Sequence, residues 1–173
     1  MLVIRDILVP VDFEPTSSHA LAYARDLARM FGARLHILYV LEDTFALPAG
    51  TEGSLSAFPR FEREAEDDAR GRLTALLTEQ DRKAGAMTAV RLGASPASSI
   101  VSYAAEIQAD VIVMGTHGRR GTALGTIGSV AEQVVRTASC PVLTLRQHPS
   151  DVALARAAAV EIASPLKNGT APA

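Results

Sequence analysis

The chain has 173 residues, of which 48% are hydrophobic, 21% charged and 5% aromatic. This length favours a single domain, and the single cysteine, Cys140, excludes an internal disulfide framework and a four-thiolate zinc site. A formal net charge of -2 argues against nonspecific nucleic-acid binding, which requires clustered positive charge. The chain has no apolar run of about 20 residues and no signal-peptide pattern. We therefore expect a cytoplasmic protein with neither a membrane nor a nucleic-acid partner.

Short apolar runs alternate along the chain with segments of helical spacing. Runs of branched residues are typical of parallel strands buried on both faces, and apolar residues three and four apart predict helices. The predicted elements are strand 7–12, helix 16–31, strand 34–41, loop 43–60, helix 61–84, strand 88–92, helix 95–107, strand 110–114, loop 115–128, helix 129–138 and strand 141–146. Hydroxyl residues at 16–18 are candidate N-caps of the first helix, and Gly32 is its candidate C-cap.

Strands that alternate with helices imply an α/β domain with a parallel sheet and right-handed crossovers. In such sheets the ligand crevice lies at the carboxyl ends of the strands, where the chain order reverses. Two segments follow predicted strands in this way: Pro10–Asp12 and the loop after Met114. We expect the domain to span 1–147 and an alanine-rich tail over 148–173 to be partly helical or disordered.

A glycine-rich loop separates the fourth predicted strand from the last helix, with five glycines from Gly115 to Gly128. Glycine permits close approach of a ligand, and the N–H groups of such a loop and of the next helix can bind phosphate. The alternative needs no ligand, because a tight turn and a capping box between Ser129 and Glu132 would also explain the pattern.

Other nucleotide and cofactor classes fit less well. The only lysines are Lys83 and Lys167, so the loop lacks the Walker lysine, and GxGxxG spacing is absent after the first strand. A receiver domain would carry an aspartate after the third strand, where this chain has Gly93. A flavodoxin-type carrier would need a hydroxyl-rich and glycine-rich loop after the first strand, where Asp12–Pro15 stand instead.

Two separate motifs resemble the universal stress protein superfamily. The spacing Gly115-x2-Gly118-x9-Gly128-Ser129 is similar to the nucleotide-binding pattern of that family, and the run ILVPVD over 7–12 resembles its first strand. The resemblance extends over about residues 4–146. It implies a doubly wound five-stranded parallel sheet in the order 3-2-1-4-5, of the Rossmann-like, adenine nucleotide alpha hydrolase-like class. It also implies ATP, with or without Mg²⁺, at the strand ends and a homodimer through strand five, 141–146.

The resemblance further implies a role for each residue of the ATP site. Asp12 would accept hydrogen bonds from the ribose, since a carboxylate accepts hydroxyl donors and repels phosphate; a helix cap is the alternative for Asp12. The residues beside the adenine and the nucleoside would be Pro10, Val40, Met114 and Gly115. The phosphate donors would be Gly118, Gly128, Ser129 and Val130, with Arg119 or Arg120 either neutralising phosphate or simply solvated.

These features predict an ATP-binding regulator of the stress response with, at most, slow hydrolysis. His117 is the one titratable candidate in the loop, and we interpret it as structural or solvated; no catalytic residue and no metal ligand is predicted. The alternative is an interaction module of the same fold that binds no nucleotide and contacts unknown protein partners through its dimer surface. The apolar fifth strand favours a dimer, because exposed apolar edges pair unless the tail covers them.

Overall fold

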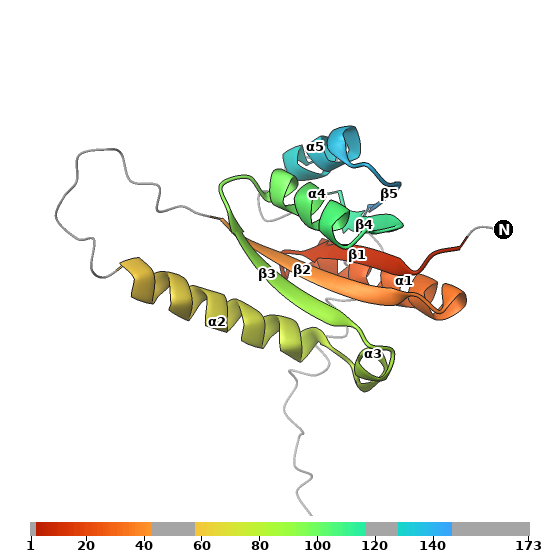
Figure 1. Ribbon diagram of the computed structural model, residues 1–173, viewed down its shortest axis with the longest axis horizontal. Helices are drawn as coiled ribbons and strands as arrows, with labels where there is room; N and C mark the ends of the chain where they lie inside the picture. The colour runs from red at the N-terminus through yellow and green to blue at the C-terminus, as the bar shows by residue number, and fades with distance from the viewer. Residues whose placement is uncertain (1–2, 43–57, 117–127, 147–173) are drawn as a thin grey trace, which may run out of the picture.

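The computed structural model describes residues 3–42, 58–116 and 128–146. The elements are β1 (Asp6–Val11), α1 (Pro15–Phe31), β2 (Arg34–Glu42), α2 (Phe58–Leu76), α3 (Glu79–Lys83), β3 (Met87–Gly93), α4 (Pro96–Glu106), β4 (Val111–Gly115), α5 (Ser129–Thr137) and β5 (Val142–Leu145). Figure 1 shows the strands side by side with helices above and below them. The tail predicted over 148–173 and most of the glycine-rich loop lie outside the described residues.

The five strands form one parallel sheet in the order β3-β2-β1-β4-β5, which confirms the predicted doubly wound topology. The central strand β1 pairs with β2 from Asp6 to Val11 and with β4 at Ile7 and Leu8. The chain therefore reverses direction across the sheet between β1 and β4. Ligand crevices of open α/β sheets form at such a reversal, outside the carboxyl ends of the strands.

Helices cover both faces of the sheet, and the strand residues alternate between two apolar clusters. Ile7 and Val9 of β1 face one cluster, to which α1 and α2 contribute. Leu8 of β1 faces the other cluster, which α4 and α5 complete. In Figure 1, α4 and α5 lie together on one side of the sheet and α2 lies on the other. This double burial explains why the strands are apolar on both faces.

The helix predicted over 61–84 is two helices, so that prediction was wrong in its length. α2 begins earlier, at Phe58, and ends at Leu76; α3 begins after Thr78. The Thr78 hydroxyl accepts the Asp81 N–H and the Asp81 carboxylate accepts the Thr78 N–H, at 3.1 and 2.9 Å. This capping box stabilises the start of a new helix within a charged run.

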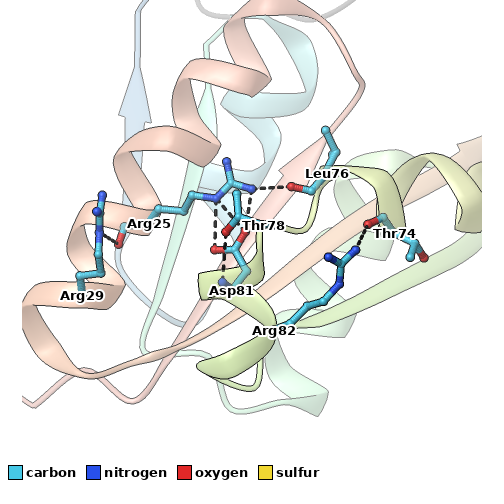
Figure 2. A network of polar contacts seen from close by, with 7 residues as sticks. All are labelled: Arg25, Arg29, Thr74, Leu76, Thr78, Asp81 and Arg82. Carbon is cyan, nitrogen blue, oxygen red and sulfur yellow. Dashed lines mark hydrogen bonds and ion pairs between the residues drawn. The ribbon is translucent and has the colours of Figure 1, made fainter.

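A polar network joins α1 to the chain between α2 and α3 (Figure 2). Arg25 donates through Nη2 to the Leu76 carbonyl oxygen at 2.7 Å and forms an ion pair with Asp81. Burial opposes ionisation of Asp81, but hydrogen bonds from Arg25 and Thr78 outweigh it, and the pKa of Asp81 lies below its usual value. The network fixes the turn between the two helices against α1.

The predicted cap of α1 is correct at its C-terminus and wrong at its N-terminus. Gly32 is the C-cap, with φ of 65° in the left-handed region that glycine adopts easily, as predicted. The N-cap is Glu14, with Pro15 as the first helical residue, so the prediction of a cap among residues 16–18 was wrong. The Ser17 and Ser18 hydroxyls instead donate to the Glu14 carbonyl oxygen. Across the described residues, no helix has the length and apolar character needed to cross a membrane.

Candidate functional site

The predicted nucleoside residues lie at the carboxyl ends of adjacent strands. Val11 pairs with Tyr39, so the same register places Asp12, the next residue, level with Val40. Leu8 pairs with Ile112 in β4, and the same offset places Pro10 level with Met114. The fold therefore brings together residues from three separate parts of the chain at the point of chain reversal.

Three of these residues form an apolar surface on the side of the sheet that α4 and α5 cover. Val40 is 8% exposed and Met114 is 5% exposed, and both belong to the apolar cluster on that side. Pro10 is half-buried and faces the same side, because it stands two residues after Leu8 in β1. Apolar side chains at the carboxyl ends of the strands suit an aromatic base better than a charged group.

Asp12 is half-buried in the turn that leads into α1. Its Oδ1 accepts the Glu14 N–H at 3.1 Å, and its own N–H donates to Ser17 Oγ at 3.3 Å. This is an Asx turn, in which an aspartate side chain holds the backbone two residues later. The turn uses Oδ1 alone, and among the described residues no hydrogen-bond donor contacts Oδ2. The local turn and a ligand can therefore use the same side chain.

Gly115 ends β4 against the start of α1. A Cβ built on Gly115 would lie 2.7 Å from Thr16 Cγ2 and 3.3 Å from the Thr16 carbonyl carbon. Real Cβ atoms do not approach other atoms at 2.7 Å, so a side chain here would require Thr16 to move. Gly115 thus has a packing reason to be glycine, independent of any ligand.

Two hydrogen-bonded residues flank the undescribed part of the glycine-rich loop. Thr116 is 2% exposed, and its N–H donates to the Leu145 carbonyl oxygen at 2.9 Å. The Gly128 N–H donates to the Thr116 carbonyl oxygen at 2.7 Å, which joins the start of α5 to the end of β4. The predicted phosphate donors Gly118 and Arg119 lie outside the described residues, as do His117 and Arg120. The Gly128 amide is already used within the protein, which leaves it no donor for a phosphate.

α5 begins at Ser129, as predicted, and its first turn does not form the capping box that was the alternative explanation for Ser129. The N-cap is Gly128, which has no side chain, and Ser129 is the first helical residue. Glu132 donates its N–H to the Gly128 carbonyl oxygen at 2.9 Å, and its carboxylate lies 3.8 Å from Arg136 Nη1. The first N–H groups of a helix, here those of Ser129 and Val130, have no acceptor within the helix and gain one from a cap, water or an anion.

Phe13 belongs to this region, although the sequence analysis did not predict it. Its ring contacts Tyr39 and Arg72, and it has a positive φ of 65°. A positive φ at a residue other than glycine is uncommon and cannot be read from the sequence. Among the described residues, no group of three or more histidine, cysteine, aspartate or glutamate side chains is placed to hold a metal ion.

A separate cavity of about 310 Å³ lies at the opposite end of the strands, near the amino end of β2. Arg25, Arg29 and Asp81 provide its charged lining, together with Leu35 and other small or apolar residues. The Arg25 guanidinium is paired with Asp81 and that of Arg29 with Asp26, so this cavity offers little net positive charge to an anion. The strand carboxyl ends remain the better candidate for a ligand site.

Comparisons with known proteins identify the family and agree with the fold. The model of the universal stress protein family matches residues 4–146. Universal stress protein MJ0531 of Methanocaldococcus jannaschii is 31% identical over 143 residues, which cover 83% of this chain and 82% of that protein. Hypothetical protein MJ0577 of the same organism shares the fold at a TM-score of 0.70, with 21% identity over 86% of this chain and 99% of that one. A universal stress protein solved in complex with cAMP shares the fold at a TM-score of 0.53, with 23% identity over 85% of this chain and 100% of that one.

Proposed function

The chain belongs to the universal stress protein family, and from this premise we propose that it binds ATP at the carboxyl ends of β2, β1 and β4. The observation that carries the proposal is that three features lie together at the carboxyl ends of the strands. The first is an apolar surface, and the second is Oδ2 of Asp12, which accepts from no donor among the described residues. The third is the start of α5, whose N-cap is a glycine. Their chemistry matches a base, a ribose and a phosphate chain.

Each surface would hold one part of the nucleotide. The apolar surface of Pro10, Val40 and Met114 would bury a face of the adenine. Oδ2 of Asp12 would accept a ribose hydroxyl, and its negative charge keeps the phosphates away from this end of the site. The N–H groups at the start of α5 would donate to phosphate oxygens, helped by the positive end of the helix dipole. Gly118 and Arg119 remain proposed contacts.

We propose regulation by binding, with at most slow hydrolysis, as the role of this site in the stress response. The backbone N–H groups at the start of α5 would bind the negatively charged phosphate chain of ATP. The residues of the described site hold and orient this ligand, and Asp12 has the role of an acceptor for the ribose. One neighbour of the same fold was solved in complex with cAMP, which supports an adenine nucleotide as the class of ligand.

Calorimetric titration of the purified chain with ATP tests the proposal, with and without Mg²⁺. We expect saturable heat, an increase in the melting temperature, and release of an adenine nucleotide from the freshly purified protein on denaturation. GTP is the matched control, because it carries the same phosphates on a different base. The absence of both heat and thermal shift at millimolar ATP would refute ATP binding and favour the interaction module that binds no nucleotide.

We further propose a homodimer through β5. This strand is at the edge of the sheet and, within the described part of the chain, pairs with β4 alone. Its four residues, Val142–Leu145, are each partly exposed. Pairing of two such edges would satisfy the outward backbone groups and cover apolar side chains. A light-scattering mass near that of one 18.3 kDa chain at all micromolar concentrations would refute the dimer.

A further inference from the structure

The residue after the ribose-site aspartate has an unusual backbone. Phe13 has φ of 65°, in the left-handed region that a side chain other than glycine rarely adopts. It stands between Asp12 and Glu14, which the Asx turn joins through a hydrogen bond of 3.1 Å. The backbone conformation of Phe13 therefore determines the orientation of the Asp12 carboxylate. A strained residue that persists in a structure requires contacts that hold it.

Two side chains from other elements hold the Phe13 ring. The Tyr39 ring of β2 lies 4.8 Å from it between centroids, at an interplanar angle of 42°. The guanidinium carbon of Arg72 on α2 lies 3.8 Å from the centroid of the Phe13 ring, a cation–π distance. Tyr39 is buried in the core, whereas Arg72 is exposed. Phe13 is thus attached both to the sheet and to α2.

The opposite end of the same turn is also fixed. Ser17 Oγ accepts the Asp12 N–H at 3.3 Å and donates to the Glu14 carbonyl oxygen at 3.0 Å. Thr16 packs against Gly115 at the end of β4. The turn is therefore held by the packing of α1 on one side and by the Phe13 contacts on the other. Of these supports, Arg72 is the one that can be changed at the surface of the protein.

We propose that Phe13 and Arg72 are positioning residues for the ribose, which act by holding the Asp12 carboxylate in the orientation that accepts the sugar hydroxyls. This inference rests on the proposed function, because it takes Asp12 as the ribose acceptor. It assigns α2 a part in nucleotide recognition without direct contact between Arg72 and the ligand. Phe13 and Arg72 should affect binding of the sugar alone, because their contacts orient the Asp12 side chain and form no part of the surfaces proposed for the base and the phosphates.

The test compares ATP with 2′,3′-dideoxy-ATP, which has the same base and phosphates but no ribose hydroxyls. In the wild-type protein, ATP should bind more tightly than the dideoxy compound. The substitution Arg72→Met keeps an unbranched apolar stem and removes the guanidinium group with its charge, and it should reduce this preference about two- to fivefold. Arg72→Lys should retain most of the preference, because a lysine can also lie over the ring. Arg70→Met is the matched control on the same helix, where Arg70 pairs with exposed Glu66.

A second variant separates positioning from general stability. Phe13→Leu removes the ring and keeps an apolar side chain, and we expect at least the same loss of preference. In that background Arg72→Met should cause no further loss, because the two side chains act through one contact. Equal weakening of both nucleotides by Arg72→Met, or an unchanged preference, would overturn the inference while leaving ATP binding intact. If the wild-type protein binds neither nucleotide, the proposed function fails and the inference fails with it.

Discussion

Arg25 Nε donates to both carboxylate oxygens of Asp81, at 3.2 and 3.0 Å, although 56 residues separate the two in the chain. The Asp81 side chain is 8% exposed and that of Arg25 is 24% exposed, so the pair is largely shielded from water. Asp81 also accepts the Thr78 N–H that begins α3. A single carboxylate thereby sets the start of one helix and its attachment to another.

Asp81→Asn should lower the free energy of unfolding by about 2 kcal/mol, because it removes the charge that compensates Arg25 and weakens the helix cap. The value falls below that of a fully buried pair, since Arg25 retains some contact with water. Urea unfolding measures the change. Glu79→Gln in the exposed pair with Lys83 is the control and should cost less than about 0.5 kcal/mol. An equal effect of both substitutions would contradict the structural role of Asp81.

The same residue should contribute to acid sensitivity. The pKa of Asp81 is lowered in the folded protein, because hydrogen bonds from Arg25 and Thr78 outweigh the opposing effect of burial. The unfolded state therefore binds the proton more readily, and the stability from this carboxylate is full above about pH 4–5 and lost as pH falls through the folded pKa. Unfolding curves of Asp81→Asn between pH 3 and 5 should be flatter than those of the wild type. Parallel curves would show that other groups dominate.

Gly115→Ala should destabilise the protein by about 1–3 kcal/mol, because the new methyl group would overlap Thr16. Thr16→Ser removes Cγ2, the closest atom at 2.7 Å, and keeps the hydroxyl, so the double variant should recover part of the loss. Recovery is incomplete because the Thr16 carbonyl carbon still lies 3.3 Å away. Thermal or urea unfolding of the wild type, the two single variants and the double variant measures the coupling energy between the two substitutions. Additive effects of the two substitutions would show that the clash is relieved elsewhere.

Asp12→Asn should weaken ATP binding about tenfold, since a neutral amide replaces the charged acceptor proposed for the ribose. Asparagine keeps an oxygen that can accept the Glu14 N–H, so the turn and the fold should persist. Calorimetry with ATP gives the affinity, and an unchanged melting temperature without nucleotide confirms the fold. Unchanged affinity would place the ribose away from Asp12.

Thr144→Pro should break the proposed dimer while preserving the sheet. Carbonyl oxygens of Pro141 and Leu145 accept from β4, so alternate residues of β5 bond to β4 and the Thr144 amide faces the open edge. A proline there removes an outward donor and no bond to β4. Light scattering should show a shift from dimer to monomer, and Thr144→Val, which keeps the amide, should remain dimeric. A dimeric proline variant would exclude β5 as the interface.

The sheet was predictable because its strands are apolar runs bounded by polar residues and helices, and Gly32 marked the end of α1 correctly. The break between α2 and α3 was not predicted, because Thr78 and Asp81 lie within a charged run whose spacing continues through them. The start of α5 at Ser129 was predicted correctly, whereas the alternative of a capping box between Ser129 and Glu132 is not formed, because Gly128 occupies the cap position. Phe13 was missed because its role depends on a backbone angle and on contacts from β2 and α2.

The closeness of Gly115 and Thr16 also affects how related sequences should be compared. In a relative that had lost its nucleotide, a threonine at the position of Thr16 in the first turn of α1 would still disfavour any side chain at the position of Gly115. Glycine at 115 therefore reports the packing of α1 on β4 and is a poor marker of ligand binding. If the proposed site is right, a relative's retention of its ligand is better judged from the residue that corresponds to Asp12 and from a glycine cap at the start of α5.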